Sequence, residues 1–235
     1  MTTEIRLGWH RHNNPDGTLG GWVEDTAEVA DTAYIGLNAE VGGNAKVLDE
    51  AKVFDEAKVY GEARIYGSAE IFGNARVCDE AEVYGNANIY SNAEISGKAK
   101  VFCEAVIQDK ARVSGNAKVY DKAWIHGKAE IYGNARVFGN AWVYDNAQVS
   151  GNAGIYDKAL IYGHAEVYDD AEVYDDARVY GHAEVYDNAQ IYDNARVHNH
   201  AAIYGYALIR GKSEICGTDK VLDERKGKWN RKENN

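Results

Sequence analysis

The stretch YGNARVFGNAWVYDNAQV, residues 132–149, contains nearly the same six residues three times. Val137 and Val143 lie six positions apart, and Ala135 and Ala141 keep the same spacing. A pair of turn-forming residues, Gly-Asn or Asp-Asn, separates one hexad from the next. A short repeat of this kind buries its apolar side only when several copies stack on one another. The fold therefore depends on how far the repeat extends.

The hexad runs through most of the 235 residues. A step of six residues from Val23 to Val221 meets Val or Ile at each of 34 positions. Ala stands four residues after the first 31 of these positions, from Ala27 to Ala207. No insertion interrupts the register, so the repeat predicts one continuous structure.

Within each hexad the residue types alternate as they do in an extended strand. The unit reads Ala, a variable residue, Val or Ile, and then most often Tyr or Phe, followed by two turn residues. Alternate side chains of a strand point to opposite faces, so Ala and Val lie inside while the variable residue and the aromatic lie outside. Val, Ile and Tyr favour strands, and Gly, Asn and Asp favour tight turns. These features predict an all-β protein.

Two β architectures could use a four-residue strand followed by a two-residue turn. An antiparallel meander prefers the order Asn-Gly in its hairpins, whereas this chain has Gly-Asn, as at Gly133-Asn134. A three-sided solenoid bends at each turn, pairs its strands in parallel, and needs a small residue such as Ala in its narrow corners. The sequence therefore favours a single three-sided solenoid with three hexads in each coil.

An aliphatic residue followed by a small residue four places later resembles the motif of the hexapeptide-repeat, left-handed parallel β-helix proteins. The segment GGWVE at residues 20–24 also resembles bacterial and phage proteins of the hexapeptide-repeat transferase type. This resemblance implies a left-handed coil and a homotrimer that forms along one face. For enzymes of this family it also implies acyl transfer from acetyl-CoA by a histidine base. The chain departs from the family motif because Tyr or Phe follows the aliphatic residue and no loop leaves the repeats.

The limits of the repeat predict the domain organisation. Residues 23–221 form the β-helix, residues 1–22 cap its beginning, and residues 222–235 form a charged C-terminal tail or cap. Caps are expected because an open-ended solenoid exposes strand edges and core at both ends.

Composition narrows the partners and the compartment. The chain carries 26 Lys and Arg against 37 Asp and Glu, a net charge of −11, which argues against binding nucleic acid through its phosphates. No apolar run reaches the ~18 residues of a membrane span, and no segment resembles a signal peptide. The three cysteines fall in different columns of the predicted solenoid, so we expect free thiols and a cytoplasmic location.

Residues eighteen apart should stack, so the sequence can be arranged into columns. One outward column is aromatic without a break from Tyr66 to Tyr192, which we interpret as a stabilising ladder of stacked rings. On the next face, apolar residues replace the charged residues that stand at equivalent positions elsewhere. Trp and Tyr anchor many protein interfaces, so we predict an interaction surface there. Its residues are Val106, Trp124, Trp142 and Leu160, with Tyr144 and Tyr162 beside them.

Metal binding has only weak candidates. His164, His182 and His200 lie eighteen apart at one corner, and imidazoles at that spacing would need a further converging ligand to hold a metal. Acidic corners such as Asp169-Asp170 could attract Ca²⁺, although solvated charge is the simpler interpretation. We therefore predict no metal.

Three functions fit the sequence. The leading hypothesis is a non-catalytic solenoid scaffold that binds a protein partner or assembles with itself through the aromatic face, without a cofactor. The alternative is an acyltransferase that uses acetyl-CoA, with His126 as its best general base because it lies on the candidate interface face next to Trp124. No Gly-x-Ser-x-Gly, Walker or Cys-x-x-Cys motif is present. The third is an acidic rod that mimics nucleic acid, a hypothesis weakened by the interspersed Lys and Arg.

Overall fold

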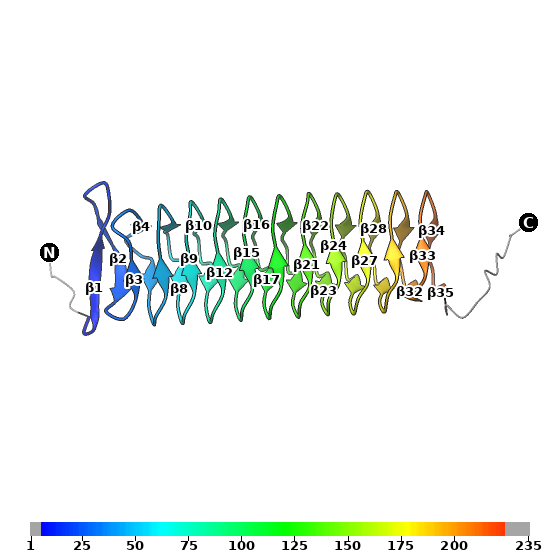
Figure 1. Cartoon of the computed structure of the whole chain (residues 1–235), viewed down its shortest axis with the longest axis horizontal. Helices are drawn as coiled ribbons and strands as arrows, with labels where there is room; N and C mark the ends of the chain where they lie inside the picture. Colours follow the sequence, from blue (N-terminus) through cyan, green and yellow to red (C-terminus); the bar gives the residue numbers. More distant parts are fainter. Residues whose placement is uncertain (1–5, 224–235) are drawn as a thin grey trace, which may run out of the picture.

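The protein is a straight three-sided β-solenoid (Figure 1). A computed structural model describes residues 6–223, and nearly every hexad in it contributes one two-residue strand. Strands eighteen residues apart pair in parallel, which gives three sheets that run the length of the rod. The predicted three-sided parallel β-solenoid is confirmed, while its left-handed coil stays an expectation from the resemblance. Residues 6–223 contain no helix that could cross a membrane.

The three sheets are named A, B and C here. Sheet A contains β1 (Trp9–Asn13), β2 (Leu19–Glu24), β5 (Glu40–Val41), β8 (Lys58–Val59), β11 (Arg76–Val77), β14 (Glu94–Ile95), β17 (Arg112–Val113), β20 (Glu130–Ile131), β23 (Gln148–Val149), β26 (Glu166–Val167), β29 (Glu184–Val185), β32 (Ala202–Gly205) and β35 (Lys220–Asp223). Sheet B contains β3 (Glu28–Val29), β6 (Lys46–Val47), β9 (Arg64–Ile65), β12 (Glu82–Val83), β15 (Lys100–Val101), β18 (Lys118–Val119), β21 (Arg136–Val137), β24 (Gly154–Ile155), β27 (Glu172–Val173), β30 (Gln190–Ile191) and β33 (Leu208–Ile209). Sheet C contains β4 (Tyr34–Ile35), β7 (Lys52–Val53), β10 (Glu70–Ile71), β13 (Asn88–Ile89), β16 (Val106–Ile107), β19 (Trp124–Ile125), β22 (Trp142–Val143), β25 (Leu160–Ile161), β28 (Arg178–Val179), β31 (Arg196–Val197) and β34 (Glu214–Ile215).

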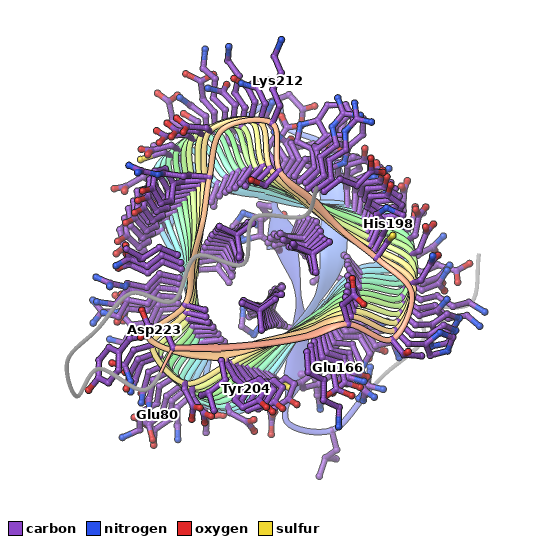
Figure 2. All side chains as sticks on the ribbon, turned by 90° about the vertical axis from the view of Figure 1, so that its right-hand side faces the viewer. Glu80, Glu166, His198, Tyr204, Lys212 and Asp223 are labelled. Carbon is purple, nitrogen blue, oxygen red and sulfur yellow. The ribbon has the colours of Figure 1, made fainter. Side chains whose placement is uncertain are left out.

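The core is a narrow column of aliphatic side chains inside the triangle (Figure 2). Ala135 and Val137 are both fully buried, and the same holds for nearly every Ala and Val or Ile of the repeat. Polar and aromatic side chains of the repeat stand on the outside of the three sides. Alternate residues of the hexad therefore point into the core and out to solvent.

The corners use Gly and Asp for two different reasons. Gly133 has φ 69°, and a Cβ there would lie 3.0 Å from the backbone of Gly151 in the next coil, so a side chain would be crowded as well as strained. Asp145 occupies an equivalent corner with φ 59°. Its Oδ2 accepts a hydrogen bond from the backbone N–H of Gly163, 3.2 Å away in the next coil. An Asp corner therefore joins one coil to the next.

A β-hairpin closes the beginning of the rod. Strand β1 pairs antiparallel with β2 and covers the first edge of sheet A. The side chain of Asn14 then satisfies the edge of β4, because its Oδ1 accepts from the Ile35 N–H at 2.8 Å and its Nδ2 donates to the Ile35 carbonyl at 3.1 Å. The expected N-terminal cap coincides with this hairpin, although β2 already belongs to the first coil. Of the expected C-terminal tail only residues 222–223, the end of β35, lie within the described residues.

Candidate functional site

The outer surface of sheet B is a continuous ladder of rings. The rings from Tyr66 to Tyr192 stack with centroids 4.7–5.0 Å apart and planes within 12° of parallel. Offset stacking of aromatic rings is favourable beyond the area that it buries. The ladder predicted from the sequence is confirmed. In the neighbouring outward column of sheet B one strand differs, because Gly154 stands where the other strands carry a longer side chain.

Sheet C carries the predicted apolar stripe on four consecutive strands, β16, β19, β22 and β25. Val106 lies in register with Trp124, Trp124 with Trp142, and Trp142 with Leu160. The two indole rings meet edge to face, with centroids 4.8 Å apart and an interplanar angle of 67°. Trp142 keeps 40% of its surface exposed, whereas Trp124 is half-buried beside it.

The column next to this stripe is aromatic and contacts it. His126 stacks on Tyr144 with centroids 4.9 Å apart, and Tyr144 stacks on Tyr162 at the same distance. The Trp124 ring lies 5.3 Å from the His126 ring and joins the two columns. The structure therefore brings the six residues predicted as an interaction surface onto one side of the rod, with His126 in their midst. We call this surface the tryptophan face.

Burial controls the chemistry of His126. Desolvation lowers the pKa of its imidazole below the ordinary value of 6.5, and the nearby carboxylates of Asp109 and Asp145 oppose the shift. The closer of these contacts, His126 Nδ1 to Asp109 Oδ2, measures 3.9 Å. The ring is accordingly neutral at neutral pH and adds to the apolar character of the tryptophan face.

Trp124 carries an unsatisfied polar atom. Its Nε1 is buried, and no acceptor for its N–H lies among residues 6–223. A buried donor without an acceptor costs roughly 1–3 kcal/mol. Buried polar atoms without a hydrogen-bond partner are rare in native proteins, and a functional role is a common reason for them. This indole is thus held in place at some cost to stability.

The charged columns elsewhere make the tryptophan face distinctive. On sheet A, Arg112 pairs with Glu94 at 3.1 Å, and on sheet B, Lys100 pairs with Glu82 at the same distance. The four strands of the tryptophan face carry no charged residue in the corresponding column. On sheet C, charged residues resume in this column only beyond the stripe.

The corner histidines form a stack instead of a metal site. The rings of His164, His182 and His200 lie parallel, with successive centroids 4.8 and 5.0 Å apart. Within residues 6–223, no three His, Cys, Asp or Glu side chains are grouped so as to hold a metal ion. The acidic corners have another role, since Asp169 Oδ2 accepts the backbone N–H of Asp187 at 3.5 Å.

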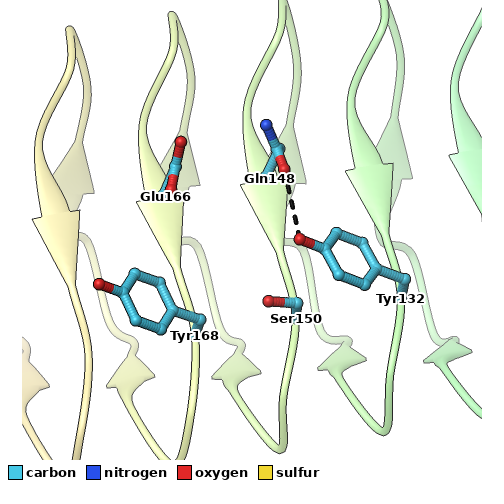
Figure 3. Close-up of a pocket in the computed structure, with 5 residues that line it drawn as sticks. All are labelled: Tyr132, Gln148, Ser150, Glu166 and Tyr168. Carbon is cyan, nitrogen blue, oxygen red and sulfur yellow. Dashed lines mark hydrogen bonds between the residues drawn. The ribbon is translucent and has the colours of Figure 1, made fainter.

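The structure has a hollow on sheet A that we did not predict from the sequence (Figure 3). Tyr132, Ser150 and Tyr168 occupy three successive positions of one column, so a small residue stands between two rings. Gln148 and Glu166 border the same space, whose volume is about 240 Å³. The sequence held the necessary information, because residues eighteen apart form one column and Ser150 stands there between Tyr132 and Tyr168. We call this hollow the Ser150 slot.

Three segments of the repeat are similar to a known family of repeats. The sequence model of a family described as YdcK Beta solenoid repeat matches residues 111–127, 129–145 and 189–206. The first two segments contain Trp124 and Trp142 of the tryptophan face. No curated protein matches the chain. The transferase type suggested by the resemblance is not confirmed, and the chain is a β-solenoid repeat protein that is similar over these three segments to the YdcK β-solenoid repeat family.

Proposed function

We propose that this protein is a non-catalytic β-solenoid scaffold that pairs with a second copy of itself through the tryptophan face, the two rods lying antiparallel. The observation that carries the proposal is the chemical symmetry of one column on sheet C. From β7 to β34 this column reads Lys, Glu, Asn, Val, Trp, Trp, Leu, Arg, Arg, Glu. Reading it backwards places an opposite charge or a like apolar group at almost every position.

A twofold axis between β19 and β22 would bring these groups together. Trp124 of one copy would then face Trp142 of the other, and Val106 would face Leu160. Two steps beyond the apolar residues Glu70 would face Arg196, and three steps beyond them Lys52 would face Glu214. Self-complementary contacts of this kind are typical of twofold interfaces. A parallel pair in the same register would instead set each charge against itself.

The arginines of this column support the same arrangement. Arg178 and Arg196 lie in register on neighbouring strands, and like charges placed opposite each other are unfavourable. Within residues 6–223 neither guanidinium forms a hydrogen bond or an ion pair. A carboxylate from a second copy, such as Glu70, would relieve this repulsion. The unpaired arginines therefore match what an antiparallel copy offers.

The apolar centre would supply most of the binding free energy. Aromatic side chains bury 150–250 Å² each when fully covered, and apolar burial contributes roughly 25 cal/mol per Å². Because Trp142 keeps 40% of its surface exposed and Trp124 less, covering the four indoles of two copies is worth roughly 5–10 kcal/mol on this basis, before the cost of association of about 4–15 kcal/mol is subtracted. The net charge of −11 on each copy opposes association, so salt should strengthen it modestly.

The oligomeric state tests the proposal directly. Light scattering should give a dimer for the wild type and a monomer for the double variant Trp124→Glu with Trp142→Glu. Circular dichroism should be unchanged, because both side chains point away from the core. The matched control is Tyr120→Glu with Phe138→Glu on sheet B, which should leave the dimer intact. A trimer, as the family resemblance implies, or a double variant that still dimerises would overturn the proposed face.

Cross-linking tests the antiparallel arrangement. In a background where the native cysteines are Ser, a mixture of Val106→Cys and Leu160→Cys proteins should form a mixed disulfide, since these positions face each other. Each variant alone should cross-link poorly. The opposite result, with each variant cross-linking to itself, would show a parallel pair.

One observation favours the alternative, acyl transfer from acetyl-CoA. A general base must be neutral at the working pH, and burial lowers the pKa of His126 accordingly. Calorimetry with acetyl-CoA distinguishes the two functions. We expect no stoichiometric binding; binding that is lost in His126→Ala would make the enzyme the better hypothesis.

A further inference from the structure

The Ser150 slot has the thickness of one flat group. Rings on this solenoid stack with centroids 4.7–5.1 Å apart when they occupy neighbouring coils. Tyr132 and Tyr168 are two coils apart, so their rings are separated by about 10 Å. A planar group placed midway would contact each ring at the spacing that the ladders already use. Within residues 6–223, no other column has a single small residue between two aromatic rings.

Each of the two rings that line the slot makes one further contact. Tyr168 stacks on Tyr186 at 4.9 Å with its far face, so only the near face is open to the slot. The hydroxyl of Tyr132 donates to Gln148 Oε1 at 3.3 Å (Figure 3). Desolvation raises the pKa of Tyr168 to about 12, so its phenol stays neutral and protonated at neutral pH.

The electrostatics beside the slot favour a cation. Glu166 and Glu184 lie in register on neighbouring strands, and within residues 6–223 neither carboxylate forms a hydrogen bond or an ion pair. Earlier in the same column, Arg112 lies between Glu94 and Glu130 and contacts both, at 3.1 and 3.9 Å. Like charges in register are destabilising. A cation at the slot would supply the partner that this end of the column lacks.

We propose that the Ser150 slot binds a planar cation of the guanidinium class. The cation stacks between the rings of Tyr132 and Tyr168, and its N–H groups donate to the carboxylate of Glu166 and to the side-chain carbonyl of Gln148. Stacking on two tyrosine faces uses both the planarity and the charge of the ligand. The volume of about 240 Å³ is below that of sites for drug-sized ligands and suits one such group.

The proposal is tested with three small probes that differ in one property each. Ethylguanidinium is planar and charged, ethylurea is planar and neutral, and ethylammonium is charged but not planar. In NMR titrations of the full-length protein at low salt, the ethyl protons of ethylguanidinium should move upfield, because the group sits between two ring faces. Its affinity should exceed that of either other probe by about tenfold. Equal affinity for ethylammonium or ethylurea would overturn the proposal.

Variants locate the site. Ser150→Tyr completes the ladder and fills the slot, so it should abolish the upfield shift while leaving the fold intact. Glu166→Gln keeps the slot but removes its charge, and should weaken binding by about tenfold at low salt. Binding that persists unchanged in Ser150→Tyr would place the probe elsewhere and contradict the proposal.

A matched slot on sheet B separates shape from charge. Phe138→Ser removes one ring between Tyr120 and Tyr156, but beside this opening Arg136 and Gly154 occupy the positions that Gln148 and Glu166 have in the natural slot. In a protein that also carries Ser150→Tyr, this new slot should not bind ethylguanidinium. If it binds as well as the natural slot, any gap in a ladder suffices, and the assigned role of Glu166 is wrong.

The guanidinium group can come from a free metabolite or from an arginine side chain of another protein. Acetyl-Gly-Arg-Gly-amide tests the second source in the same titration. Tighter binding of the peptide than of ethylguanidinium, lost in Ser150→Tyr, identifies an arginine of a protein, whereas binding of ethylguanidinium alone identifies a small molecule. Binding of neither at concentrations up to tens of millimolar would overturn the proposal.

Discussion

Sheets A and B share one core and differ on the outside. Beneath both, each coil contributes one buried aliphatic residue and one buried Ala. On sheet B the outer column next to the aliphatic residues carries rings without interruption from Tyr66 to Tyr192. On sheet A the equivalent column is broken by Cys78, Ser96 and Ser114, and then by Ser150. The repeat thus fixes the inside, while the outer columns are free to differ from one side to another.

This difference separates stability from recognition. The complete ladder of sheet B offers the same ring surface at every coil from Tyr66 to Tyr192. A break in a ladder, as at Ser150, or an exchange of charge for indole, as at Trp124, marks one position along the rod. Irregularity in an otherwise uniform solenoid is therefore the feature that points to function.

The largest expected effect tests whether the cores beneath the two sheets are equivalent. Ala135→Leu beneath sheet B and Ala147→Leu beneath sheet A each place a larger side chain in a corner that has no free space. Overpacking should lower the free energy of unfolding by about 1–3 kcal/mol, and by nearly the same amount at both positions. Chemical denaturation measures both. A clear inequality would show that the difference between the sheets extends into the core.

The second effect measures what the ladder contributes. Tyr120 stacks on Phe102 at 4.9 Å and on Phe138 at 4.8 Å, whereas within residues 6–223 Tyr132 stacks on no ring. Because an aromatic pair is worth about 0.5–1.5 kcal/mol, Tyr120→Ala should cost about 1–2 kcal/mol more than Tyr132→Ala. Denaturation midpoints of the two variants provide the comparison. Equal costs would mean that the stacked rings add little to the stability of the solenoid.

The smallest effect concerns the end rings of the two ladders. Burial, with a contribution from a neighbouring glutamate, raises the pKa of Tyr66 on sheet B and of Tyr168 on sheet A to about 12. The unfolded chain loses these protons from about pH 10, so their contribution to stability is complete below pH 10 and disappears as the pH rises to about 12. Tyr66→Phe and Tyr168→Phe should therefore each flatten the alkaline loss of stability. Chemical denaturation at pH 9 to 11.5 would detect this smaller loss of stability. If only one of the two variants showed it, the Ser150 slot would have to change the titration of Tyr168, the ring that lines it.

The sequence predicted the backbone better than it predicted the ends and the surface details. The hexad encodes its own period, so the inward side chains and the register of Trp124 with Trp142 follow from counting. The bonds of Asn14 to Ile35 lie outside the repeat and depend on how the hairpin folds back over the first coil. The role of Asp145 at its corner was also missed, since a turn-forming residue gives no sign of the N–H that its carboxylate will reach. Periodicity can be read from one sequence, whereas contacts between unlike segments cannot.

The fixed offset of eighteen residues between neighbouring coils makes the length of the rod a countable quantity. If a block of eighteen residues were deleted from the repeat or added to it, the coils on either side would still make the same core and corner contacts. The rod would become shorter or longer by about 4.8 Å. The proposed antiparallel pair would be less tolerant, because Glu70 would meet Arg196 only when equal numbers of coils separate each from the centre of the tryptophan face. A copy with one coil more on one side would fold normally and still fail to match its shorter relative. A rod that pairs as proposed would therefore select a second copy by its length.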